Sequence, residues 1–173
     1  MQALIRIPGL QDRLHRENFN RYLLQSAMAS IVVLVLLLIL DTVTQTVLIA
    51  ALGASTFIAF AVPRSLQSDP RYMIGGYLVG ILVGSSISTL NASLHFSDIV
   101  VTHTVMIIFG AIATGLAMFV MVVTKTEHPP AAALALGLVL NEWDLLTLVV
   151  VIVGVIALSI FKRLVLPILM DLM

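Results

Sequence analysis

The sequence predicts an all-α protein that spans a membrane several times. Hydrophobic residues make up 60% of its 173 residues and charged residues 10%, whereas soluble domains are about 45–50% apolar and about 25% charged. The apolar residues also fall into runs, most of them close to the roughly 20 residues that a helix needs to cross the hydrocarbon layer. We therefore expect about six membrane segments, over residues 22–40, 43–62, 73–90, 100–123, 129–140 (short) and 145–166.

The charge balance and the absence of cysteine exclude several function classes. Nine Lys and Arg residues balance nine Asp and Glu residues, so the chain lacks the basic surface that DNA or RNA binding requires. Without cysteine it forms no disulfide, thiolate metal site or cysteine nucleophile. It also contains no Ser/His/Asp set, no carboxylate pair and no HExxH-type spacing. We therefore expect no enzymatic activity, no cofactor and no metal site.

The first 20 residues differ from the rest of the chain. Arg6, Arg13 and Arg16 alternate with apolar residues, a pattern typical of a segment that lies on the membrane surface. The stretch contains Asp12 and Glu17 and no serine, which argues against a removable transit peptide. We expect residues 1–20 to form a cytoplasmic interfacial segment and residues 21–173 a single transmembrane domain.

Basic residues indicate the orientation. With six crossings, all nine Lys and Arg residues fall on one side, and the other side receives only the acidic residues Asp41, Asp98, Glu142 and Asp144. The positive-inside rule then places both termini in the cytoplasm, and we expect a bacterial inner membrane. If 129–140 merely dipped into the membrane, Lys162 and Arg163 would lie outside. We therefore expect this segment to cross as a short helix plus an extended stretch.

The segments form the same series twice, long, interrupted and long, over residues 21–90 and 100–166. Three crossings per half is an odd number, so the second half must be inverted relative to the first, as in many transporters. Interruptions are expected in the second segment, at Gly53-Ala54-Ser55-Thr56, and in the fifth, at Glu127-His128-Pro129-Pro130. The alternative is that Gly53 only permits close helix packing and that the prolines end a loop at the interface.

The two prolines predict a helix start inside the membrane, because proline suits the first helical turn and disfavours helical backbone before it. A buried helix N-terminus carries unpaired N–H groups and a partial positive charge, which together attract a small anion. The expected binding residues are Gly53, Ala54, Ser55, Thr56, His128, Pro129 and Pro130.

His128 is the strongest candidate among them. Imidazole changes charge near neutral pH, so His128 could pair with an anion or hand it a proton. The alternative is that it caps the helix and binds nothing. Ser55 and Thr56 could likewise bond only to the carbonyl one turn earlier. Four further charged residues are candidates for a vestibule or gate, although topology alone also explains the arginines: Arg64, Arg71, Lys125 and Glu127.

Gly76, Gly80 and Gly84 recur at every fourth position of the third segment. Small residues at this spacing clear one face of a helix so that another backbone can approach closely. We expect this face to serve helix packing.

Two stretches resemble the HPP family of integral membrane proteins: LGASTFIAFAVPRSLQSDPRYMIGGYLVG and TKTEHPPAAALALGLVL, the second with the tripeptide His128-Pro129-Pro130 that names the family. The resemblance implies transport, because plant and cyanobacterial relatives act as nitrite transporters. We therefore expect a transporter or channel for a small inorganic anion, nitrite first, which works as a homo-oligomer in the lipid bilayer. The alternatives are another small anion as substrate, or a membrane scaffold that transports nothing.

Overall fold

A computed structural model describes residues 16–40, 46–94 and 98–172, and all regular structure in these ranges is helical. Within the described residues the all-α prediction is confirmed, and six α-helices correspond to the six expected segments. Most of the expected interfacial segment, 1–20, lies outside the described residues. The helices are α2 (Arg16–Leu40), α3 (Thr46–Ala61), α4 (Pro70–Ser93), α5 (Ile99–Thr124), α6 (Pro129–Leu140) and α7 (Leu145–Val165), with 3-10 turns η1 (Leu66–Ser68) and η2 (Leu166–Ile168).

Helix length separates two groups. Within the described residues, three helical stretches are long and apolar enough to cross a membrane, Pro70–Ser93, Ile99–Thr124 and Leu145–Ile168. Shorter apolar helical stretches are Leu23–Val35, Ile49–Ala61 and Pro129–Leu140. The twelve residues of α6 match the expected short segment at both ends.

Aspartate side chains determine where three of the helices begin. Asp69 accepts from the N–H of Arg71 at 3.0 Å, with Pro70 in the first turn of α4, and Asp98 caps α5 in the same way. Asp144 and Thr147 form a capping box at the start of α7. Hydrogen bonds from the Thr147 hydroxyl and N–H hold the pKa of Asp144 below its ordinary value. Such caps satisfy N–H groups that a helix start leaves unpaired.

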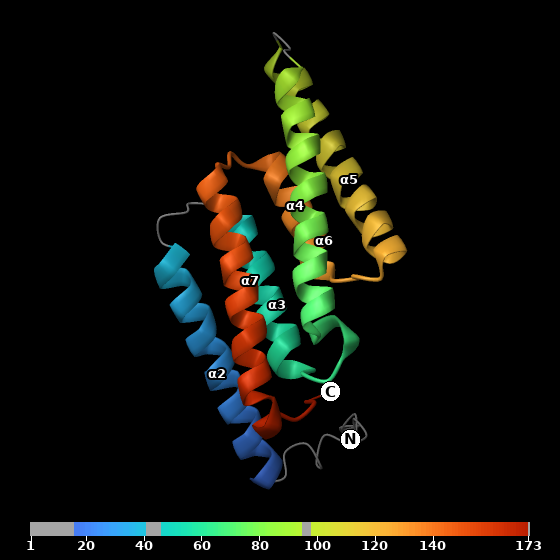
Figure 1. The fold of residues 1–173 in the computed structure, drawn as a ribbon. Coiled ribbons are helices and arrows are strands. Elements are labelled where there is room, and N and C mark those ends of the chain that lie inside the picture. The colour runs from blue at the N-terminus through green and yellow to red at the C-terminus, as the bar shows by residue number, and fades with distance from the viewer. Residues whose placement is uncertain (1–15, 41–45, 95–97, 173) are drawn as a thin grey trace, which may run out of the picture.

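The short helix α6 lies in the middle of the fold. It packs against α3, α4 and α5, and eight of its twelve residues are buried. Figure 1 shows α4 and α5 as an antiparallel pair that extends beyond the other helices at the end away from η1. On the other side of the fold, α7 packs against α2, α3 and α4.

Glycines on α4 allow α6 to approach closely. A Cβ atom added at Gly80 would collide with the carbonyl oxygen of Ala131. At Gly84 it would lie 2.8 Å from the Cα of Ala135, and at Gly76 2.7 Å from the Cβ of His128. The glycine face of α4 therefore meets the start and middle of α6 with backbone against backbone.

The expected interruption of the second segment is wrong. α3 continues without a break through Gly53, Ala54, Ser55 and Thr56, because all of these residues keep a backbone N–H and helical bonding satisfies it where water is absent. An added Cβ at Gly53 would meet no atom within 4 Å, so this glycine does not serve close packing either. The interruption before Pro129 is confirmed, and the inverted repeat stays a prediction.

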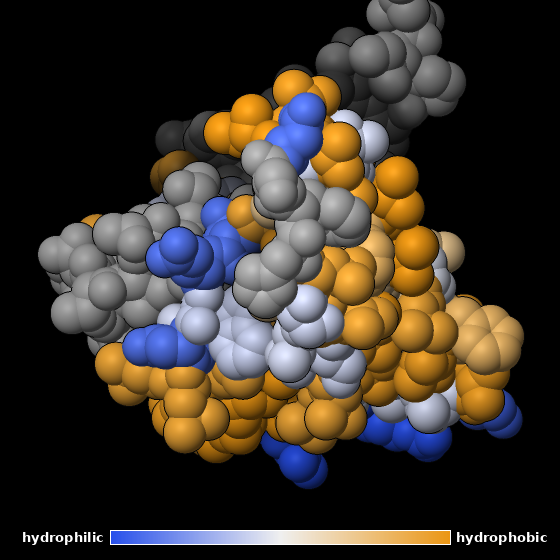
Figure 2. Space-filling view, turned by 90° about the horizontal axis from the view of Figure 1, so that it is seen from above, coloured by the Kyte–Doolittle hydropathy of each residue, from blue (hydrophilic) through white to orange (hydrophobic). Residues whose placement is uncertain are grey.

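Charged residues separate towards the two ends of the molecule. Contacts at one end link the loop before α4 to α7 and the C-terminal residues, with Arg64 N–H donating to Asp171 and Lys162 Nζ donating to the carbonyl of Ser68. Asp98 and Asp144 cap helices at the opposite end. Seen from above, hydrophilic residues form small groups among extensive apolar surface (Figure 2). The side of the membrane on which each end lies stays a prediction.

Candidate functional site

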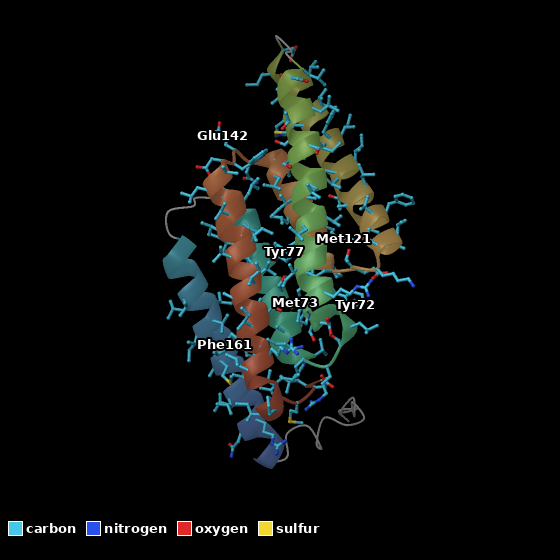
Figure 3. The ribbon with its side chains drawn as sticks, in the orientation of Figure 1. Tyr72, Met73, Tyr77, Met121, Glu142 and Phe161 are labelled. Carbon is cyan, nitrogen blue, oxygen red and sulfur yellow. The ribbon has the colours of Figure 1, made fainter. Side chains whose placement is uncertain are left out.

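Three buried polar side chains from separate helices meet in the interior. Ser55 from α3 and Tyr77 from α4 are 0% exposed, and His128, which precedes α6, is 1% exposed. The Ser55 hydroxyl oxygen lies 2.8 Å from the Tyr77 hydroxyl and 2.8 Å from His128 Nε2. The Tyr77 and His128 rings are 5.7 Å apart between centroids. Tyr77 lies one turn beyond Met73 on α4 (Figure 3). We call these three residues the histidine cluster.

The second ring nitrogen of His128 reaches the loop between α3 and α4. Nδ1 lies 2.9 Å from the carbonyl oxygen of Gln67. A carbonyl only accepts, so Nδ1 carries the proton of this bond. The side chain makes no capping bond to α6. His128 thus occupies the N-cap position of α6, but its ring bonds to Ser55 and Gln67 and not to the helix.

Hydrogen bonding in the cluster is compatible with two charge states of His128. When the imidazole is neutral, Tyr77 donates to Ser55 and Ser55 donates to Nε2. When the imidazole is charged, Nε2 donates to Ser55, whose hydroxyl then donates to the carbonyl of Ala51, 3.1 Å away. A rotation of one hydroxyl therefore accommodates a proton on His128 without leaving a polar group unpaired.

The start of α6 offers few backbone donors. Pro129 and Pro130 occupy its first turn and have no N–H. The N–H of Ala131 already donates to the carbonyl of His128 at 2.9 Å. The groups that this helix end could offer to an anion are therefore the helix dipole and the imidazole. Because Ser55 and His128 are in direct contact, no space for an anion lies between their side chains in this structure.

The other expected binding residues lie elsewhere. Ala54, Pro129 and Pro130 line an apolar groove of about 450 Å³ on the outside of the helices. Gly53 and Thr56 line a groove of about 390 Å³ between α2 and α3, and the Thr56 hydroxyl bonds to the carbonyl of Leu52 one turn earlier. Of the seven expected residues, only Ser55 and His128 are linked to each other by a side-chain hydrogen bond among the described residues.

The expected vestibule residues surround the same end of the molecule as the Gln67 loop. Arg64, Arg71 and Lys125 are exposed and Glu127 is half-buried. Lys125 ends α5 in the left-handed conformation, with φ of 54°. Between described residues they make no hydrogen bond to the histidine cluster, and their role as a vestibule or gate stays a prediction.

Sequence reasoning missed three polar residues. Tyr77 lies between Gly76 and Gly80 in an apolar segment. Its isolated hydroxyl was the signal that could have identified it as part of a polar site. Lys162 is 5% exposed and donates from Nζ to the carbonyl of Ser68 at 3.1 Å. Gln25 in α2 donates from Nε2 to the carbonyls of Phe60 and Met170, both at 2.8 Å. A polar side chain in an apolar span is itself a sign of a specific partner.

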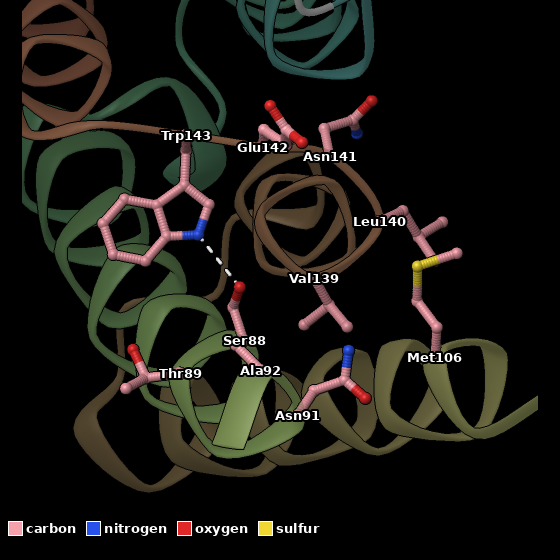
Figure 4. A pocket seen from close by; sticks show the side chains of 10 residues that line it. All are labelled: Ser88, Thr89, Asn91, Ala92, Met106, Val139, Leu140, Asn141, Glu142 and Trp143. Carbon is pink, nitrogen blue, oxygen red and sulfur yellow. Dashed lines mark hydrogen bonds between the residues drawn. The ribbon is translucent and has the colours of Figure 1, made fainter. Parts of the chain in front are cut away.

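A pocket of about 720 Å³ lies at the opposite end of α6. Figure 4 shows it around the end of this helix, with Asn91, Asn141 and Glu142 on its rim. Trp143 donates from Nε1 to the Ser88 hydroxyl at 3.0 Å and thereby ties the α6–α7 connection to α4. The short helix α6 thus extends from the histidine cluster to this pocket, which we call the outer pocket because the expected topology places it outside.

Comparison with known proteins agrees with the expected family. A model described as HPP, transmembrane region, matches residues 15–169. Two transmembrane proteins of Dictyostelium discoideum are 35% identical over 90 residues and 32% identical over 94 residues. These alignments cover 52% and 54% of this chain but only 29% and 28% of the relatives. No solved structure matches.

Proposed function

The chain belongs to the HPP family of integral membrane proteins. From that premise we propose that it is a transporter or channel for a small inorganic anion, with nitrite as the proposed substrate. The observation that carries the proposal is the buried His128 at the start of a half-helix, bonded to α3 through Ser55 and to the Gln67 loop. An intramembrane ionisable residue with named partners marks a functional site more often than a structural one.

The depth of the cluster suits an anion path that starts at the basic end. Ser55 lies six residues before the end of α3, about 9 Å along the helix at 1.5 Å per residue. The hydrocarbon layer is about 30 Å thick. If the end of α3 marks the edge of this layer, Ser55 lies about 6 Å from its middle. This depth supports a site near the midplane, although only one of the two helices beside it, α6, begins there.

Nitrite fits the chemistry of the site. It carries one charge and accepts hydrogen bonds at its oxygens, so a single imidazolium neutralises it. In the proposed path, Arg64, Arg71 and Lys125 attract the anion to the entrance. Separation of Ser55 from His128 then opens the cluster, with the outer pocket as the far mouth. The proposed assembly is a homo-oligomer whose subunits each carry one path.

Flux into liposomes tests the proposal. Purified protein should move nitrite, and His128→Ala should abolish the flux because it removes the one side chain of the cluster that can carry a positive charge. His103→Ala is the matched control, since His103 is exposed on α5 and should leave flux unchanged. Monodisperse elution of both variants excludes a folding defect. Normal flux in His128→Ala would contradict the assigned role.

The alternative function is a scaffold that transports nothing. It is favoured by one observation, namely that every polar atom of the histidine cluster already has a partner within the protein. The same experiment separates the two functions. Flux no greater than in empty liposomes for nitrite, formate and chloride would establish the scaffold and exclude the transporter.

A further inference from the structure

Two buried donors bind consecutive carbonyls of one loop. His128 Nδ1 donates to the carbonyl of Gln67 at 2.9 Å, and Lys162 Nζ donates to the carbonyl of Ser68 at 3.1 Å. The two donors come from the start of α6 and the end of α7, and they are 1% and 5% exposed. The 3-10 turn η1 is therefore held by two side chains, one at the start of α6 and one near the end of α7.

The ammonium group of Lys162 is only partly satisfied. It carries three N–H donors, and among the described residues Ser68 is the one hydrogen-bond acceptor that it reaches. Asp69 and Asp171 act on its charge from a longer distance, but their carboxylates accept from the backbone N–H groups of Arg71 and Arg64. A buried cation with unused donors is built to accept a further, negatively charged partner.

We infer that His128 and Lys162 form an anion-binding site at the basic end, which the carbonyls of Gln67 and Ser68 fill when the loop is seated. This inference rests on the proposed function and adds to it an inner site and its occupant. The ligand class is a small singly charged oxyanion, because two acceptor oxygens on one ligand can replace two carbonyls. Hydrogen bonds to a charged acceptor are roughly twice as strong as those to a neutral one, so the anion competes with the loop.

In the proposed movement, residues 62–68 of the loop separate from the two donors, and Asp69 stays in place as the cap of α4. The Ser68 hydroxyl bonds within the loop itself, to the carbonyls of Pro63 and Ser65. The Ser65 hydroxyl is buried in the same loop without a hydrogen-bond partner among the described residues. Seating of the loop therefore leaves one polar group unsatisfied, which lowers the cost of lifting it.

Ser68 reports the position of the loop. Its side chain is fully buried, and the natural chain has no cysteine, so Ser68→Cys introduces one hidden thiol of similar size. The rate of its modification by uncharged N-ethylmaleimide is measured in purified full-length protein, with and without sodium nitrite. Sodium chloride at the same concentration controls for salt, and Ala117→Cys in the α5 core controls for general loosening.

Nitrite should accelerate the modification of Ser68→Cys at least threefold and saturably, with no effect at Ala117→Cys. Adding Lys162→Met should remove the nitrite dependence, whereas adding Arg163→Met, which neutralises the exposed neighbouring cation, should preserve it. Lys162→Arg should retain most of the response. These results would support the site.

A rate that nitrite leaves unchanged or slows would overturn the inference, and so would equal acceleration by chloride or an unaltered response in the Lys162→Met background. These outcomes are independent of transport. Flux that requires His128, combined with a nitrite-insensitive Ser68→Cys, would refute the inner site alone. A nitrite-sensitive loop in a protein without flux would refute the transporter and keep the site.

Discussion

At the residue scale, the histidine cluster shows how a membrane interior accommodates polar side chains. Ser55, Tyr77 and His128 are all buried, and each contacts at least one other member. Water cannot pair with groups at such positions, so each partner fixes the orientation of the next. Sequence reasoning identified Ser55 and His128 individually, but their contact depends on how α3 and α6 pack.

Tyr77→Phe tests the contribution of one hydroxyl to this network. The change removes the group 2.8 Å from Ser55 and should lower the free energy of unfolding by about 1 kcal/mol. Denaturant or thermal unfolding in detergent measures the loss. The control is Tyr72→Phe, at a half-buried tyrosine near the start of the same helix. Equal stability of Tyr77→Phe and the parent would mean that the bond contributes nothing to folding.

At the element scale, α6 exists as a separate short helix because two prolines start it and α4 accommodates it. Pro129 and Pro130 fix its first turn, and Gly76, Gly80 and Gly84 leave space for its backbone. Each feature was visible in the sequence. That the glycine face meets α6, and not a neighbouring subunit, was not visible, because spacing identifies a packing face without naming its partner.

Gly80→Ala should destabilise the protein by about 1–3 kcal/mol, the usual cost of overpacking, because the new methyl group would collide with the carbonyl oxygen of Ala131. Gly115→Ala on α5 is the matched control, since its methyl group would meet nothing within 4 Å and should change stability by no more than about 0.5 kcal/mol. Unfolding of both variants under one condition measures the difference. Similar stability of the two variants would show that α4 and α6 do not pack this closely.

At the scale of the whole molecule, equal numbers of positive and negative charges conceal an asymmetric distribution. Lys162 and the loop with Arg64 and Arg71 lie at one end, and Asp98 and Asp144 cap helices at the other. The positive-inside rule associates the basic end with the cytoplasm. The proposed inner anion site therefore lies at the end of the molecule where positive charge gathers.

Single cysteines test this orientation. In intact cells, an impermeant thiol reagent should label Glu142→Cys at the outer pocket. Lys125→Cys should react only after the membrane is permeabilised, because Lys125 lies at the opposite end of the molecule from Glu142. The cysteine-free parent provides the background signal. Labelling of both variants from the same side would contradict the assigned topology.

The sequence by itself determined that the protein is helical and integral to a membrane, that six helices lie in the described residues, and where the short helix starts, because apolar content, run length and proline chemistry act locally. Its prediction of a matching break at Gly53–Thr56 failed, because residues that keep their N–H groups remain helical where no water competes. Only the tertiary structure brought Tyr77 to Ser55 and buried Lys162 beneath the Ser68 carbonyl. These contacts join residues from different helices, and their pairing depends on how the helices pack against one another.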